Sequence, residues 1–219
     1  MAGAAGDELP AKRRRVEEPA KEGRVPIFVM MPLDTISMDG KTVKDLETRL
    51  PWLEGLARSG VRGVMVDVWW GLCEPRPGEY CWDGYLELAK TLQRLGLKLQ
   101  AVMSFHQCGG NVGDSCTIPL PPWVLEPARK LGLLYQDRTG KVSSDCLSLS
   151  ADARLVFPGI GGAGTRDALA LYRDYMRSFA TSFSAFLGCT VVEIQVGMGP
   201  CGELRYPSYM LSEGWEYPG

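Results

Sequence analysis

The chain has 219 residues, 45% of them hydrophobic and 23% charged, which is enough to bury a full core as one domain. Its formal net charge of -2 argues against nucleic acid as the main ligand, because phosphate binding needs an excess of basic residues. The sequence also has no run near the ~20 apolar residues of a membrane span and no apolar core of a secretory signal.

Residues 1–24 differ in composition from the rest of the chain. Ala, Gly, Glu and Pro surround the basic run KRRR at 12–15, and we expect a disordered tail because so few apolar residues are present. The basic run is typical of a nuclear-import signal, but it is more often a solvated charge run. A plastid transit peptide is Ser-rich and poor in acids, and this tail is neither. An intracellular protein is expected, with plastid, cytosol and nucleus left open.

From Val25 onward, short apolar runs alternate with segments of helical spacing. The apolar runs predict buried strands at 25–31, 61–70, 97–105 and 190–198. The other segments predict helices at 42–59, 83–95 and 165–187. The first has a cap at Thr42, and Pro51 indicates either a kink or two abutting helices. The stretch between the third strand and the last helix is rich in Pro and Gly and predicts irregular structure.

This alternation predicts an α/β fold with a parallel sheet and crossover helices. The alternatives are an open doubly wound sheet and a (β/α)8 TIM barrel. Neither glycine-rich nucleotide-binding motif follows any strand, and polar residues at strand ends favour the barrel. Because only four strands are predicted, residues 25–219 are expected to cover about the first four βα units.

The seven cysteines are scattered without a C-x-x-C pair, and the chain has one histidine. This pattern argues against a zinc site, and no metal or cofactor is expected. We interpret the cysteines as reduced intracellular thiols, several of them packed as small hydrophobic side chains.

One carboxylate, Asp67, lies inside the apolar strand VMVDVWWG at 64–71. Burial of a carboxylate is costly unless it is paired or faces a polar cavity. It is either an acceptor for sugar hydroxyls, with Trp69 or Trp70 as a stacking platform, or half of an internal ion pair with a neighbour such as Arg62.

The single histidine, His106, ends the third strand and opens the glycine-rich loop HQCGGNVGD. This loop resembles a lid that closes over a substrate, with Asp114 as a hydrogen-bonding group. The alternative is a structural histidine before a tight turn whose Asn and Asp cap the next element.

A second loop, GPCGELRYPSY at 199–209, carries Glu203 directly after the fourth strand. A general acid needs a carboxyl group held protonated by burial or by a nearby like charge. Glu193 and Gln195 alternate on the preceding strand, so they should share a face, and Glu193 would raise the proton affinity of Glu203 if all three point inward. The alternative is a surface carboxylate paired with Arg205.

Taken together, VMVDVWWG, SFHQCGGNVGD and GPCGELRYPSY resemble the β-amylases, the family 14 glycoside hydrolases. PLPPWVLE at 119–126 and EIQVGMG at 193–199 match as well. The resemblance runs in register from about Val25 to Gly219 and is weaker over 143–164. The family usually has Pro where this chain has Met210.

The resemblance implies a (β/α)8 barrel that removes maltose from the non-reducing ends of α-1,4-glucans such as starch and maltodextrin, with inversion. It implies that Glu203 is the general acid and that Asp67, His106 and Asp114 hold glucose rings under the mobile loop 109–114. The general base of the family lies in the second half of the barrel, so no residue here takes that role.

Two other functions stay open. One is a non-hydrolytic β-amylase-like protein that senses maltose or glucan, and the other is an inactive truncated product. If the polypeptide ended at Gly219, we would expect an open sheet edge, poor stability and no hydrolysis. The sequence does not predict an oligomeric state.

Overall fold

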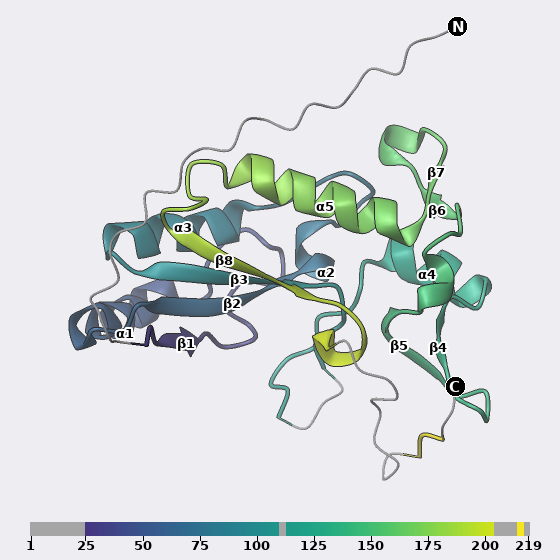
Figure 1. Ribbon diagram of the computed structural model, residues 1–219, viewed down its shortest axis with the longest axis horizontal. Helices are drawn as coiled ribbons and strands as arrows, with labels where there is room; N and C mark the ends of the chain where they lie inside the picture. The colour runs from purple at the N-terminus through teal and green to yellow at the C-terminus, as the bar shows by residue number, and fades with distance from the viewer. Residues whose placement is uncertain (1–24, 110–112, 204–213, 217–219) are drawn as a thin grey trace, which may run out of the picture.

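The computed structural model describes residues 25–109, 113–203 and 214–216. The predicted tail at 1–24, with its basic run, lies outside these residues. The four predicted strands are confirmed as β1 (Phe28–Met30), β2 (Gly63–Trp69), β3 (Lys98–Ser104) and β8 (Val191–Gly197). They form one parallel sheet in the order β1-β2-β3-β8 (Figure 1). The α/β class and the parallel sheet are therefore as expected.

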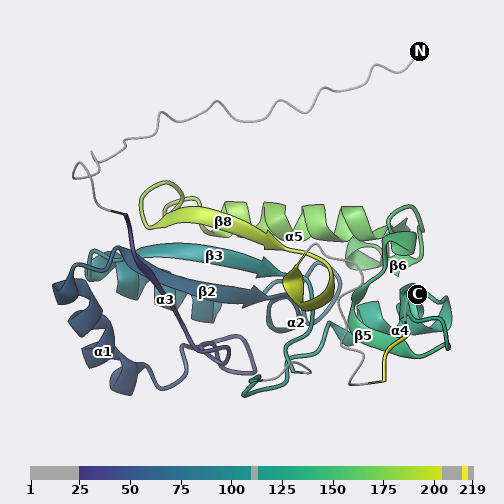
Figure 2. The same ribbon diagram turned by 60° about the horizontal axis from the view of Figure 1, so that its bottom comes forward.

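The two central strands of the sheet, β2 and β3, have one buried face and one more open face, whereas Ile194 and Val196 of the edge strand β8 are exposed. The buried side chains alternate along β2 and β3 and comprise Val64, Val66, Val68, Leu99, Ala101 and Met103. Helices α3 (Asp83–Arg94) and α5 (Ala168–Ser182) lie along one side of the sheet in both views (Figure 2). The opposite face carries Asp67, which register places beside Val102, and Gln195 next along the row. Alternation along a strand thus sends the polar side chains away from the apolar core.

The helix boundaries differ from the prediction at two N-termini. Helix α1 spans Leu46–Ser59, and the expected cap Thr42 instead lies in a turn where its N–H donates to Ser37 Oγ at 3.1 Å. Pro51 is the sixth residue of α1, where proline removes the backbone hydrogen bond to the Glu47 carbonyl, yet the segment is one continuous helix and not two abutting helices. Helix α5 starts only after Asp167, whose carboxylate accepts the Ala170 N–H at 2.7 Å.

The stretch predicted to be irregular contains regular elements, so that prediction was wrong. It holds α4 (Pro122–Lys130), the antiparallel pair β4 (Leu134–Gln136) and β5 (Val142–Leu147), and the first strand of the pair β6 (Phe157–Pro158) and β7 (Thr165–Arg166). Short helical turns are α2 (Trp70–Cys73), η1 (Leu149–Ala151), η2 (Ile160–Gly162) and η3 (Pro200–Gly202). Pro122 is the first residue of α4, where a missing N–H costs nothing.

Aromatic side chains fix α5 against the rest of the core. The Trp82 indole donates to Ser178 Oγ at 2.9 Å, and its ring meets those of Phe179 and Phe183 edge-on. The Tyr175 hydroxyl donates to the Val68 carbonyl near the end of β2 at 3.1 Å. These contacts hold the crossover that leads into β8. Within the described ranges, no helix is long and apolar enough to cross a bilayer.

Candidate functional site

The loops that follow β2, β3 and β8 gather at the same end of the sheet (Figure 2). A cavity of about 220 Å³ opens there, and the predicted residues Asp67, His106 and Asp114 all line it. Gly202, which precedes Glu203, forms part of the wall. Three of the four candidate site residues therefore meet in one place, as expected for side chains at the carboxyl ends of parallel strands.

Asp67 is held at the bottom of this cavity by the neighbouring strand. Its carboxylate accepts the Ser104 hydroxyl at 2.8 Å, which satisfies one oxygen of a side chain only 9% exposed. Burial raises its pKa, the Ser104 hydrogen bond opposes this, and the negative charge of Asp114 adds to it. Arg62, the ion-pair partner considered from the sequence, precedes β2 at the other end of the strand.

His106 presents a neutral imidazole to the cavity. Its ring contacts Trp69 edge-on with centroids 5.3 Å apart, and burial lowers its pKa to about 4 against the opposing charge of Asp114. Its Nδ1 is buried and has no hydrogen-bond partner among the residues that the structure covers. A neutral imidazole with an unused ring nitrogen suits a hydroxyl-bearing ligand better than an anion.

Of the two tryptophans proposed as a stacking platform, only Trp69 lines the cavity. Its indole donates to the Leu33 carbonyl at 2.9 Å. Trp70 is fully buried, with its indole donating to Glu74 at 2.7 Å, so it does not act as a platform.

Asp114 faces the same cavity from the far end of the glycine-rich loop. Its carboxylate accepts the Gly109 N–H at 2.9 Å, and residues 110–112 between them lie outside the described ranges. Both the capping interpretation and the ligand-binding interpretation of Asp114 are thus compatible with its position, since a carboxylate has further lone pairs.

The turn before Glu203 packs directly against His106. Gly202 has φ of +72°, and a Cβ added there would lie 2.6 Å from the imidazole Cε1, so glycine is required. Cys201 also has a positive φ, of 56°, and its N–H donates to the Asp145 carboxylate at 2.8 Å. Asp145, whose own carbonyl accepts the Gln107 N–H at 2.8 Å, therefore ties the turn to the segment after His106.

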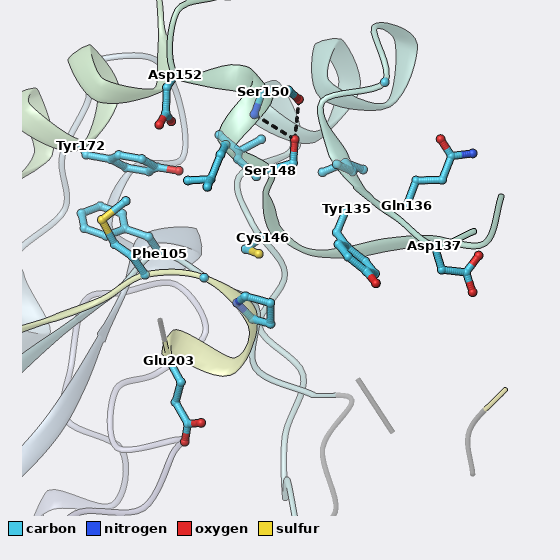
Figure 3. A pocket seen from close by; sticks show the side chains of 17 residues that line it. Phe105, Tyr135, Gln136, Asp137, Cys146, Ser148, Ser150, Asp152, Tyr172 and Glu203 are labelled. Carbon is cyan, nitrogen blue, oxygen red and sulfur yellow. Dashed lines mark hydrogen bonds between the residues drawn. The ribbon is translucent and has the colours of Figure 1, made fainter. Parts of the chain in front are cut away.

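Glu203 itself is exposed and lines a second, neighbouring cavity of about 660 Å³ (Figure 3). Phe105 and Tyr172 form one wall, with ring centroids 4.6 Å apart, and Tyr135 lies on another. In this view the Glu203 carboxylate points away from Asp152 and Tyr172. The backbone places Glu203 one residue from the cavity of Asp67 and His106, but its side chain is not among the groups that line it. Arg205, its considered partner, lies outside the described residues.

Glu193 and Gln195 share one face of β8, as alternation predicted. The Gln195 amide donates to Glu193 at 3.0 Å, and the Gln100 amide donates to the other oxygen at 2.8 Å. These amides hold the Glu193 carboxylate along the strand, well before its end at Gly197. The proposed influence of Glu193 on Glu203 stays a prediction.

Comparison with known proteins adds the family. Residues 28–219 match the sequence profile of Glycosyl hydrolase family 14. The chain belongs to this family. It is 53% identical over 206 residues to "Beta-amylase 2, chloroplastic" of Oryza sativa subsp. japonica, covering 93% of this chain and 36% of the relative. It is 53% identical over 200 residues to "Beta-amylase 1, chloroplastic" of Arabidopsis thaliana, covering 90% and 34%.

A solved structure is similar as well. The catalytic domain of beta-amylase from Paenibacillus polymyxa superposes with a TM-score of 0.66 at 33% identity, covering 89% of this chain and 42% of that one. This family 14 chain thus spans little more than a third of the length of the curated relatives it matches.

Two residues of this family 14 site were missed from the sequence. Ser104 donates its hydroxyl to Asp67. It lies in β3 beside Trp69, so the register of the two strands was the signal that could have identified it. Asp145 holds the turn before Glu203, but it comes from the hairpin strand β5 and no local pattern marks it. Within the described part of the chain, no group of three or more His, Cys, Asp or Glu side chains is arranged to hold a metal ion.

Proposed function

We propose that this family 14 chain is the N-terminal part of a β-amylase, an exo-acting enzyme that releases maltose from the non-reducing ends of α-1,4-glucans. One observation carries the proposal. Asp67, His106 and Asp114 line a single cavity, and the turn that ends in Glu203 packs against the His106 ring. The beta-amylase names of relatives about 50% identical support the same activity.

In this proposal, the small cavity binds a glucose ring. Asp67 and Asp114 accept hydrogen bonds from sugar hydroxyls, and neutral His106 pairs its free Nδ1 with another hydroxyl. Trp69 supplies an apolar edge beside them. A formal net charge of -2 for the chain is compatible with a neutral, polyhydroxylated ligand.

Glu203 is the proposed general acid, which protonates the oxygen of the leaving sugar. Inversion requires a second carboxylate about 6.5–9.5 Å away, so that a water molecule fits between it and the anomeric carbon. No residue of this chain is assigned to that base. The side chain of Glu203 would turn from the larger cavity toward the sugar when ligand binds.

We further propose that residues 25–219 form about four βα units of a (β/α)8 barrel. The open face of the sheet supports this, because Gln100, Glu193 and Gln195 lie on it as polar residues would in a barrel interior. For the compartment, we propose the plastid, since two of the rice relatives and one from Arabidopsis are named chloroplastic. None of these relatives supports a nuclear location.

The experiment measures maltose release from soluble starch by the polypeptide of the complete reading frame that contains this chain. We expect Glu203→Gln to lose at least 100-fold in kcat, the lower range for a general acid, while starch binding is retained. Glu126→Gln is the matched control, because Glu126 is an exposed carboxylate on α4.

An unimpaired Glu203→Gln enzyme would refute the acid role. Maltose binding by the parent protein in calorimetry without any turnover would favour a non-hydrolytic sensor instead. The two outcomes are distinct, because the first tests the role of Glu203 and the second tests whether the parent protein hydrolyses starch at all.

A further inference from the structure

Two thiols meet beside the candidate site. The Sγ atoms of Cys108 and Cys116 lie 3.5 Å apart, which is van der Waals contact, and Cys108 Sγ also lies 3.4 Å from the Cys116 carbonyl. Cys108 is buried and lines the small cavity, whereas Cys116 is half-buried. A disulfide has its sulfurs about 2.05 Å apart, so these two need to approach by only about 1.5 Å.

The backbone around the two cysteines is already arranged as a narrow hairpin. Cys108 and Ile118 exchange both backbone hydrogen bonds at 2.9 Å, which fixes the two arms side by side. At the next position Gly109 packs so closely that an added Cβ would lie 3.0 Å from the Cys116 carbonyl. The sulfurs are therefore held together by main-chain geometry, and little conformational entropy is lost on joining them.

We propose that Cys108 and Cys116 form a reversible disulfide, a modification site that joins the two arms of the hairpin carrying Asp114. The oxidant is a low-molecular-weight disulfide of the glutathione type. The cross-link closes a loop that contains Gly109 and Asp114, which are already joined by a hydrogen bond at 2.9 Å. It therefore fixes one wall of the cavity relative to His106.

The exchange takes place in two balanced steps. The Cys116 thiolate attacks the oxidant, its S–S bond breaks, and a mixed disulfide forms as one thiolate leaves. Cys108 then loses its proton and attacks Cys116 Sγ, forming the protein disulfide and releasing the second thiolate. Two cysteine thiols are oxidised and one external disulfide is reduced to two thiols, which take up the protons.

The environment of the thiols sets this order. Burial raises the pKa of Cys108 to about 12, helped by the neighbouring Cys116, so Cys108 is a weak first nucleophile. Cys116 is the more exposed of the two and meets the oxidant first. Once the mixed disulfide exists, Cys108 needs only to reach a sulfur already in contact.

The test counts thiols and needs no activity, so its outcome is independent of the proposed function. The reduced polypeptide of the complete reading frame is equilibrated anaerobically with oxidised glutathione, alkylated with iodoacetamide and digested with trypsin. Cys108 and Cys116 fall in one tryptic peptide, 99–129. We expect this peptide to lose both alkylation sites and two hydrogen masses, and to regain both sites after dithiothreitol.

Two variants and a matched control complete the test. In Cys116→Ser the buried Cys108 stays alkylated, and in Cys108→Ser the mixed disulfide is trapped as a glutathione adduct on Cys116. The exposed Cys189→Ser leaves the wild-type result unchanged. Two alkylated cysteines in the wild-type peptide at equilibrium would overturn the proposal. So would a stable glutathione adduct on either thiol of the wild-type peptide, or a cross-link from this peptide to any other cysteine.

Discussion

The protonation of His106 gives a direct test of how the cavity is built. Burial lowers the pKa of this imidazole from 6.5 to about 4 in the folded chain. The unfolded chain therefore binds the proton more readily, so stability contributed by the neutral ring is present above pH 6.5. It is lost as the pH falls toward 4. Because the chain has one histidine, no other imidazole obscures the effect.

The magnitude follows from the two pKa values. Protonation of His106 in the unfolded chain lowers the free energy of unfolding by about 0.2 kcal/mol at pH 7 and by about 2 kcal/mol at pH 5. The loss between the two pH values is therefore roughly 1.8 kcal/mol. Asp67 acts in the opposite direction, because burial raises its pKa and the folded state then binds that proton more tightly. The comparison variant His106→Gln removes the contribution of the imidazole to the pH dependence and keeps that of Asp67.

The assay combines urea unfolding at pH 7 and pH 5 with an NMR titration of the single imidazole Cε1–H resonance. We expect the wild type to lose about 1.8 kcal/mol more than His106→Gln on acidification, and the resonance to titrate near pH 4. A midpoint near 6.5, or equal losses in the two proteins, would show that the ring is solvated and that the cavity is not as described.

Two further predictions concern the turn that ends in Glu203. Gly202→Ala should lower the free energy of unfolding by about 1–3 kcal/mol more than Gly60→Ala, as measured by urea unfolding. Both glycines have positive φ, but only at Gly202 does an added Cβ meet His106, so similar losses would refute the contact. Asp145→Ala should cost about 1.5–3 kcal/mol because it removes the charged acceptor of the Cys201 N–H, whereas Asp145→Asn, which keeps an acceptor, should cost less. Equal losses in the two Asp145 variants would contradict this role.

The sheet could be predicted from the sequence because its signals are local. Val64, Val66 and Val68 form a continuous apolar strand, and the one charge within it, Asp67, lies on the opposite face and lines the cavity. Strand ends then converge by topology, which is why Asp67 and His106 were expected together. The stretch rich in Pro and Gly is where the prediction of irregular structure is wrong, because Pro122 starts helix α4.

The supporting contacts could not be predicted in the same way, because they join segments that are distant in the chain. The hydrogen bond from the Cys201 N–H to Asp145 links the turn after β8 to β5. Cys201 has a left-handed backbone conformation, which its residue type does not favour and the sequence does not predict. Trp70 was equally ambiguous in sequence, since a tryptophan beside a strand end can face a ligand or the core. Here Phe105 and Tyr172 surround it in the core.

In the proposed reaction, Glu203 acts on a sugar held by Asp67, His106 and Asp114. It is tested most directly by a crystal structure of the complete-reading-frame polypeptide with bound maltose. We expect hydrogen bonds from one glucose ring to the three side chains, and the Glu203 carboxyl within about 3.2 Å of the oxygen that would bridge to the next sugar. A maltose seated elsewhere, or a Glu203 carboxyl that stays turned away from the sugar, would contradict it.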